Sequence, residues 1–205
     1  MSAPPKTELE VSAAEAEAIR AAVRRADPNW SGGAEGGRRL ATEADIAPLT
    51  ELLSDPAVSG PVYDLPRPIT AESVGDWVRG CAAARERGEA LLLVTRDADG
   101  QVSGYSKITV WPDRSAAELA GAIRADRQGS GQGGAGAFRT IDWMFDALGV
   151  RLVCLTAAMD NIRSARLIEA MGFSRMGDRE AVAEDGTVRA SLYWEMTREA
   201  WRGVA

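Results

Sequence analysis

The chain has 205 residues, 45% of them hydrophobic, which is enough to bury one complete core and to carry an appendage. A formal net charge of −6 disfavours nucleic acid and anionic membranes as partners. Histidine is absent, and this excludes histidine-based catalytic triads, histidine-ligated zinc and an imidazole general base.

The two cysteines and the first residues indicate the cellular compartment that we expect for the protein. Cys81 and Cys154 lie in separate apolar segments and show neither a disulfide framework nor a metal-ligand spacing. Residues 1–6 lack the apolar core of a signal peptide, and no run approaches the roughly 20 apolar residues of a membrane span. We therefore expect a cytoplasmic protein without a metal site.

Residues 1–37 are expected to form an extension ahead of the compact domain, with residues 1–8 disordered. Ser12 opens a capping box that Glu15 completes, and this predicts a short alanine-rich helix. Its apolar stripe consists of Ala16, Ile19 and Val23. Four glycines within residues 29–37 then predict a linker. Three roles are open for the helix: docking on the domain, a homodimer contact, or none.

The compact domain is predicted to cover residues 38–205. Thr42 and Thr70 each suit the N-cap of a helix, and a proline-marked loop separates the two helices. Two further helices are predicted, one from Phe138 to Leu148 and one from Asn161 to Met171. The predicted strands are 90–95, 102–110, 116–123, 152–156 and two that flank 184–186. One strand–helix–strand crossover among antiparallel pairs implies an α/β (α+β) fold, a mixed, mostly antiparallel sheet of six to seven strands with helices on both faces.

The run from Gln128 to Ala135 has few side chains and lies between a strand ending near Ile123 and an amphipathic helix. A glycine-rich turn at a helix start leaves backbone N–H groups unpaired, and the helix dipole adds roughly half a positive charge there. Such a turn is a ready site for phosphate oxygens and needs no lysine.

Other interpretations of this run are weighed against the rest of the chain. Gly129, Gly131 and Gly134 satisfy G-x-G-x-x-G, the dinucleotide fingerprint. That fingerprint also needs an acidic residue at the end of the next strand, which here ends in Thr156, Ala157 and Ala158. A G-x-x-x-x-G-K-[ST] phosphate loop is excluded because no lysine follows. A tight turn without a ligand remains as the alternative.

A second motif begins at Asn161, shortly after the predicted strand 152–156. Asn161 suits a helix N-cap, and Gly172 suits a left-handed C-cap. Capping alone accounts for these two residues. It does not account for Ser164 one turn into the helix, about 30 residues after the glycine run.

Together the two segments resemble the GNAT acyl-CoA N-acyltransferase superfamily, and the resemblance extends over about residues 38–201. The pyrophosphate-loop pattern of that superfamily, Q/R-x-x-G-x-G/A, is matched by Gln128, Gly131 and Gly133. Its second pattern, N-x-x-S/A followed by a helix ending in G-F, is matched by Asn161, Ser164, Gly172 and Phe173. Fragments at 38–45, before Ile69 and at 117–119 resemble the Rim-type (RimJ/RimL-like) branch, which includes ribosomal-protein N-terminal acetyltransferases and spermidine acetyltransferases.

The resemblance implies acetyl-CoA as co-substrate and a small amine or a protein or peptide amine as acceptor. The residues expected at the CoA pyrophosphate are Gln128, Gly129, Ser130, Gly131, Gln132 and Gly133. The strand end at Ile123 and Arg124 would pair with the pantetheine arm, and Asn161 would bind the pantetheine or the acetyl end. Ser164 and Arg166 complete the expected contacts, with a solvated helix face as the alternative for Arg166.

The resemblance also implies direct attack of a neutral amine on the thioester. Many members of the superfamily protonate the departing thiolate with a tyrosine seven residues after the asparagine, but that position is Ile168. Ser164 is therefore the candidate acid, with helix packing as the alternative for this residue. Glu118 is the first candidate base and Asp126 the second, with a solvated strand position as the alternative for Glu118. A non-catalytic CoA- or nucleotide-binding regulatory protein is the alternative function, and a dinucleotide-dependent oxidoreductase is a third.

Overall fold

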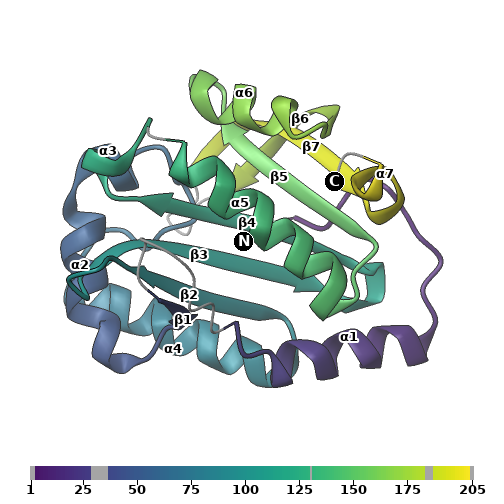
Figure 1. Ribbon diagram of the computed structural model, residues 1–205, viewed down its shortest axis with the longest axis horizontal. Coiled ribbons are helices and arrows are strands. Elements are labelled where there is room, and N and C mark those ends of the chain that lie inside the picture. The colour runs from purple at the N-terminus through teal and green to yellow at the C-terminus, as the bar shows by residue number, and fades with distance from the viewer. Residues whose placement is uncertain (1–2, 29–36, 130, 183–186, 204–205) are drawn as a thin grey trace.

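Seven strands form one mixed sheet in the part of the chain that the computed structural model describes, residues 3–28, 37–129, 131–182 and 187–203 (Figure 1). The strands are β1 (Arg38–Leu40), β2 (Ala90–Arg96), β3 (Val102–Trp111), β4 (Ala116–Ile123), β5 (Leu152–Ala158), β6 (Ser174–Val182) and β7 (Val188–Thr197). Their order is β1-β2-β3-β4-β5-β7-β6, and every neighbouring pair is antiparallel except β4 and β5, which are parallel. The expected fold class is confirmed.

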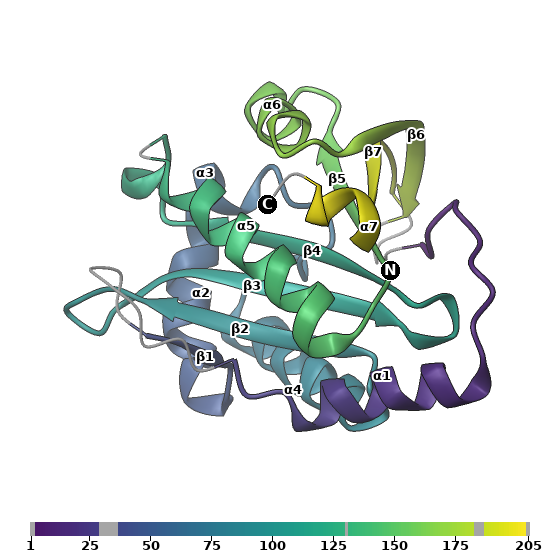
Figure 2. The same cartoon turned by 45° about the vertical axis from the view of Figure 1, so that its right-hand side comes forward.

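Helices cover both faces of the sheet, as Figure 2 shows. They are α1 (Ala13–Arg25), α2 (Ile46–Ser54), α3 (Pro56–Ser59), α4 (Ala71–Arg87), α5 (Gln132–Trp143), α6 (Ile162–Ala170) and α7 (Arg198–Arg202). Successive strand residues point to opposite faces, so Leu92 joins the core under α2 and α4 whereas Leu93 joins the core that includes residues of α5 and α6. Every helix that the structure describes is too short or too polar to cross a bilayer.

Local signals set many of the element boundaries. Thr70 and Ser73 bond each other reciprocally at the start of α4, and Gly88 ends that helix in the left-handed conformation, with φ 78°. The sequence pattern does not predict α3 or α7, because helices of 4 and 5 residues show no full apolar period. Ser130, the turn at 184–186 and most of the predicted linker lie outside the described residues.

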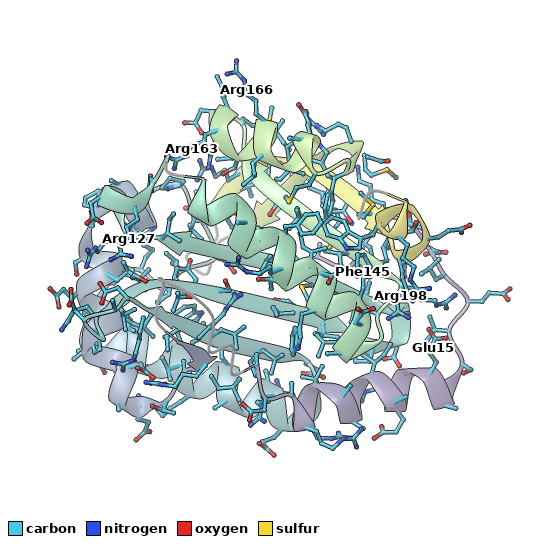
Figure 3. The ribbon with its side chains drawn as sticks, in the orientation of Figure 1. Glu15, Arg127, Phe145, Arg163, Arg166 and Arg198 are labelled. Atoms are coloured by element: carbon cyan, nitrogen blue, oxygen red, sulfur yellow. The ribbon has the colours of Figure 1, made fainter. Side chains whose placement is uncertain are left out.

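The predicted N-terminal helix is α1, and it docks on the domain. Its whole apolar stripe is buried, and Ile19 and Val23 belong to the core that includes Phe145. Burial of two such side chains contributes roughly 1.5–3 kcal/mol each. Glu15, labelled in Figure 3, also pairs with Arg151 at 2.8 Å.

Residues 3–8 cross the sheet face at β7, and we call them the N-terminal strap. Figures 1 and 2 show this segment running from α1 to the strands β6 and β7. The carboxylate of Glu195 accepts hydrogen bonds from the backbone N–H groups of Lys6 at 2.7 Å and Thr7 at 3.2 Å. The expectation of disorder is therefore wrong for these residues, because their partner lies 188 residues further along the chain, where no local pattern reports it.

Candidate active site

The strands β4 and β5 separate after three residue pairs and open a cleft between them. Their parallel pairing covers only Ala116–Glu118 against Leu152–Cys154. Residues 119–123 of β4 pair with β3 on one side and line a cleft of about 1090 Å³ on the other. Because an extended strand presents N–H and C=O groups to both sides, this edge offers main-chain hydrogen bonds to an extended ligand.

The helix α5 starts at this cleft without a side-chain cap. Its N-cap is Gly131, whose φ of 82° is a left-handed conformation that glycine adopts without strain. At Gly133 and Gly134 a Cβ atom would come within 3.3 Å of Ile123 Cδ1 and 2.9 Å of Leu167 Cδ1, the movable ends of two side chains. The first N–H groups of α5 and the positive end of its dipole lie at the cleft, which makes this turn suitable for an anion.

The glycine run matches its prediction in place but not in extent. Gly129, Gly131 and Gly133 line the cleft, as expected for a ligand-binding turn. However, α5 begins at Gln132, inside the segment that the sequence indicates as turn up to Ala135. The reason is that one left-handed glycine is enough to start the helix, and the small residues after it then join the first turn.

Two arginines that sequence reasoning missed lie beside this turn. Arg163 Nη2 donates to Gln128 Oε1 at 2.7 Å, and Gln128 Nε2 donates to the carbonyl of Ile123 at 3.1 Å. Arg163 and Arg127 both line the cleft, and both are labelled in Figure 3. Arg166 is exposed and points away from the cleft in the same view, so the structure does not bring it to the site. The rotation of α6 decides which arginine faces the cleft, and tertiary packing sets that rotation.

Ile123 lines the cleft, whereas Arg124 and Asp126 lie outside it. Arg124 binds the Asp126 carboxylate through Nε at 2.8 Å and Nη2 at 2.9 Å. This hydrogen bonding by Arg124 holds the pKa of Asp126 below its ordinary value. Of the two candidate bases, Glu118 is therefore the one that the fold places in the cleft.

Glu118 lies where β4 and β5 separate. Its side chain is 4% exposed, lines the cleft and accepts a hydrogen bond from Thr156 Oγ1 at 2.9 Å. Nearby, Lys107 pairs with Asp64 at 3.0 Å. Burial lowers the pKa of Lys107, but Asp64 and, less strongly, Glu118 raise it above its ordinary value. Glu118 thus occupies a buried polar environment, and the alternative of a solvated strand position is wrong.

The α6 side of the cleft carries Asn161, Ser164 and Ile168. Asn161 Oδ1 accepts a hydrogen bond from the backbone N–H of Ser164 at 3.1 Å, so the Nδ2 group is the part of this side chain that can donate to a ligand. Ile168 is 5% exposed and supplies no proton.

A further polar residue at the cleft wall is Tyr105, which sequence reasoning missed because the residue sits in an apolar strand. Tyr105 lines the cleft, and its buried Oη has no hydrogen-bond partner among the described residues. Burial, with a smaller effect of Asp64, raises its pKa well above the ordinary value. Tyr105 therefore keeps a neutral hydroxyl that is buried at the cleft wall.

A sheet split between two parallel strands, with an uncapped helix start at the cleft and a buried carboxylate at the fork, is an arrangement suited to an extended anionic ligand. The family model described as Acetyltransferase (GNAT) domain matches residues 38–174. The chain therefore belongs to the GNAT acetyltransferase domain family. A comparison with curated protein sequences finds no match.

Solved structures share the fold at low sequence identity. The ribosomal-protein-S5-alanine acetyltransferase from Vibrio fischeri is similar with TM-score 0.69 and 17% identity, over 85% of this chain and 99% of that one. The Mycobacterium smegmatis RimJ, in complex with CoA-disulfide, has a TM-score of 0.67 and 20% identity, over 80% of this chain and 82% of that one. RimL, a ribosomal L7/L12 alpha-N-protein acetyltransferase in complex with coenzyme A, has a TM-score of 0.69 and 16% identity, over 82% of this chain and 97% of that one.

Proposed function

We propose that the protein is an N-acetyltransferase that moves an acetyl group from acetyl-CoA to a primary amine. The observation that carries this proposal is the edge of β4 that runs from Glu118 through residues 119–123 toward the open start of α5, all in one cleft. At about 3.3 Å per residue these five residues extend roughly 16 Å. An extended arm with amide groups, joined to a diphosphate, suits such an edge.

Each part of coenzyme A has a candidate partner among the described residues. The first amides of α5 would hold the diphosphate, and Arg163 and Arg127 would add positive charge beside it. The unpaired edge of β4 would bind the pantetheine amides as a neighbouring strand does. Asn161 Nδ2 would donate near the acetyl end. The CoA complexes of the structurally similar RimJ and RimL support this choice of co-substrate.

Acetyl transfer requires one proton to leave the amine and one to reach the sulfur. Glu118 would accept the proton from the amine, whose nitrogen forms a bond to the thioester carbon. An N–H group on the β4 edge would stabilise the negative charge that develops on the carbonyl oxygen. As the carbon–sulfur bond breaks, the thiolate takes a proton. Ser164, which lines the cleft next to Asn161, is our candidate to pass that proton on while its hydroxyl regains one from solvent.

A non-catalytic CoA-binding protein is the second candidate function, and one observation favours it. The position at which many members of the superfamily carry a proton-donating tyrosine is the buried, apolar Ile168. A protein that binds CoA without turnover needs the α5 turn and the β4 edge but no acid.

Two measurements test the proposal and separate these candidates. Acetyl-CoA at 100 times its Kd should stabilise the fold by about 2.7 kcal/mol in a thermal unfolding assay, whereas NAD should not. Thiol release from acetyl-CoA should then depend on an added primary amine. Stabilisation without thiol release across an amine panel would favour the regulator, and a lack of stabilisation would overturn both candidates.

The role of Glu118 is tested by its isosteric variant. We expect Glu118→Gln to lower kcat by about 100-fold at pH 6 and by less at pH 9, because a protonated amine needs the base most. Asp113→Asn, on an exposed carboxylate outside the cleft, is the matched control. If kcat of the Glu118 variant is lowered by the same factor at every pH, so that its pH–rate profile runs parallel to that of wild type, Glu118 is not the base.

A further inference from the structure

The N-terminal strap is fastened to a buried carboxylate on β7. Glu195 is 4% exposed and accepts hydrogen bonds from the backbone of Lys6 and Thr7, from the Thr7 hydroxyl and, at 2.5 Å, from Tyr193 Oη. Burial raises the pKa of Glu195, but the bonds from Thr7 and Tyr193 outweigh it and hold the pKa below its ordinary value. Loss of the strap would leave this buried carboxylate without most of its partners, so the strap belongs to the folded structure.

A second fastening holds the start of the strap on β6. Arg179 Nη1 donates to the carbonyl oxygen of Ala3 at 2.7 Å, and its guanidinium lies 4.2 Å from the centre of the Tyr193 ring. Lys6 Nζ donates to the carbonyl oxygen of Met176 at 2.8 Å. The strap is therefore held near Ala3 as well as at Thr7, and Ala3 has a defined place.

That place is the wall of a small chamber that adjoins the cleft at the candidate base. Ala3 and Tyr63 line it together with Glu118, Thr156 and Ser191. Its volume is about 10 Å³, which admits one water-sized group. The Ser191 hydroxyl is fully buried there and has no hydrogen-bond partner among the described residues. Beyond Glu118, the site thus narrows to a pocket that has room for about one water-sized group.

The shape of this pocket bears on the acceptor. An amine that gives a proton to Glu118 brings its nitrogen to that carboxylate, so the groups on the adjacent carbon lie between the cleft and the chamber. One chain can leave through the cleft. A second branch that points away from the cleft meets the chamber, whose lining of Ala3, Tyr63 and their neighbours leaves space for about one water-sized group.

We propose that the N-terminal strap is a specificity element that limits the acceptor to amines with an unbranched carbon next to the nitrogen. It would exclude polypeptide α-amines other than that of an N-terminal glycine, because their α-carbon carries two branches. This inference rests on the proposed function, and it assigns a role to residues that precede the family match at 38–174.

The first experiment compares a matched pair of acceptors, phenethylamine and phenylalanine amide, which differ by one carboxamide on the carbon beside nitrogen. Deletion of residues 2–5 removes Ala3 but keeps Lys6 and Thr7 on Glu195. We expect the ratio of kcat/KM for phenylalanine amide over phenethylamine to rise at least 10-fold in the deletion variant. Ser12→Ala, which removes only the α1 cap, should leave the ratio unchanged. Equal ratios in the deletion variant and the full chain would overturn the proposal.

The second experiment needs no catalysis. A thiol is placed in the chamber by Ser191→Cys, in the full chain and in the deletion background, and its reaction with methyl methanethiosulfonate is followed by peptide mass spectrometry. We expect labelling at position 191 to be at least 10-fold faster without residues 2–5, and equal rates would overturn the proposal. If neither chain acetylates any amine, the proposed function fails, while the labelling still decides whether the strap closes the chamber.

Discussion

The helices α4 and α5 begin in opposite ways. At the start of α4, Thr70 Oγ1 accepts from the Ser73 N–H at 3.1 Å and Ser73 Oγ accepts from the Thr70 N–H at 3.0 Å. The helix α5 begins at Gly131, which has no side chain, and its first turn faces the cleft. A helix that meets only protein or water closes its first turn with its own side chains, whereas α5 leaves its first amides for a ligand.

The short helical turn before α2 provides a second closed start. Asp45 is fully buried, and its carboxylate accepts from the Thr42 N–H at 2.8 Å. Arg39 and Arg96 bind the same carboxylate at 2.7 and 2.9 Å. Here a carboxylate of the chain itself accepts the hydrogen bond from the helix start. At α5 we expect an anion from outside the chain to accept the same kind of hydrogen bond.

The largest effect on coenzyme A binding is expected from a substitution at Gly131, where α5 starts without a side-chain cap. Gly131→Val forces a β-branched residue into φ 82° and displaces the first amides of α5, so we predict that the affinity for coenzyme A falls by about 100-fold in calorimetry. Gly100→Val imposes the same strain at φ 79° in the β2–β3 turn and is the matched control. If the two variants bind coenzyme A equally well, the start of α5 does not bind the diphosphate.

The buried carboxylate of Asp45, in the turn before α2, should make the stability of the protein depend on pH in the acid range. Burial raises the pKa of Asp45, but hydrogen bonds from Arg39 and Thr42 outweigh it and lower the pKa to about 2. A depressed pKa in the folded state gives stability that is present above about pH 4 and lost as pH falls through 2. The free energy of unfolding of wild type relative to Asp45→Asn should therefore fall by about 2 kcal/mol between pH 6 and pH 2 in denaturant titrations. A difference that does not change with pH would contradict this account.

The smallest effect is expected at the start of α4. Thr70→Ala removes the capping box and should cost about 1 kcal/mol of stability, or a Tm decrease of roughly 2–4 °C in calorimetry. The affinity for coenzyme A should not change, because this start does not line the cleft. A loss of affinity comparable to that of Gly131→Val would mean that both variants act through global stability.

These contrasts also show what the sequence can and cannot reveal. The bounds of α4 and β4 were predictable because caps, glycines and apolar periods are local, and the family motifs located the α5 turn and Asn161. The fork between β4 and β5 was not predictable, since nothing in residues 119–123 reports that the neighbouring strand departs. The orientation of Arg163 and Arg166 depends on how α6 packs. The strap on Glu195 joins residues 188 positions apart, so only the folded chain reveals it.

The central claim is that main-chain donors at the start of α5 hold the diphosphate of acetyl-CoA while its arm lies along β4. The most direct measurement is a crystal structure of the protein with coenzyme A bound. We predict diphosphate oxygens within hydrogen-bond distance of the amides around Gly131 and Gly133, with the thiol end near Glu118. A diphosphate bound elsewhere, with the start of α5 facing only solvent, would contradict the account.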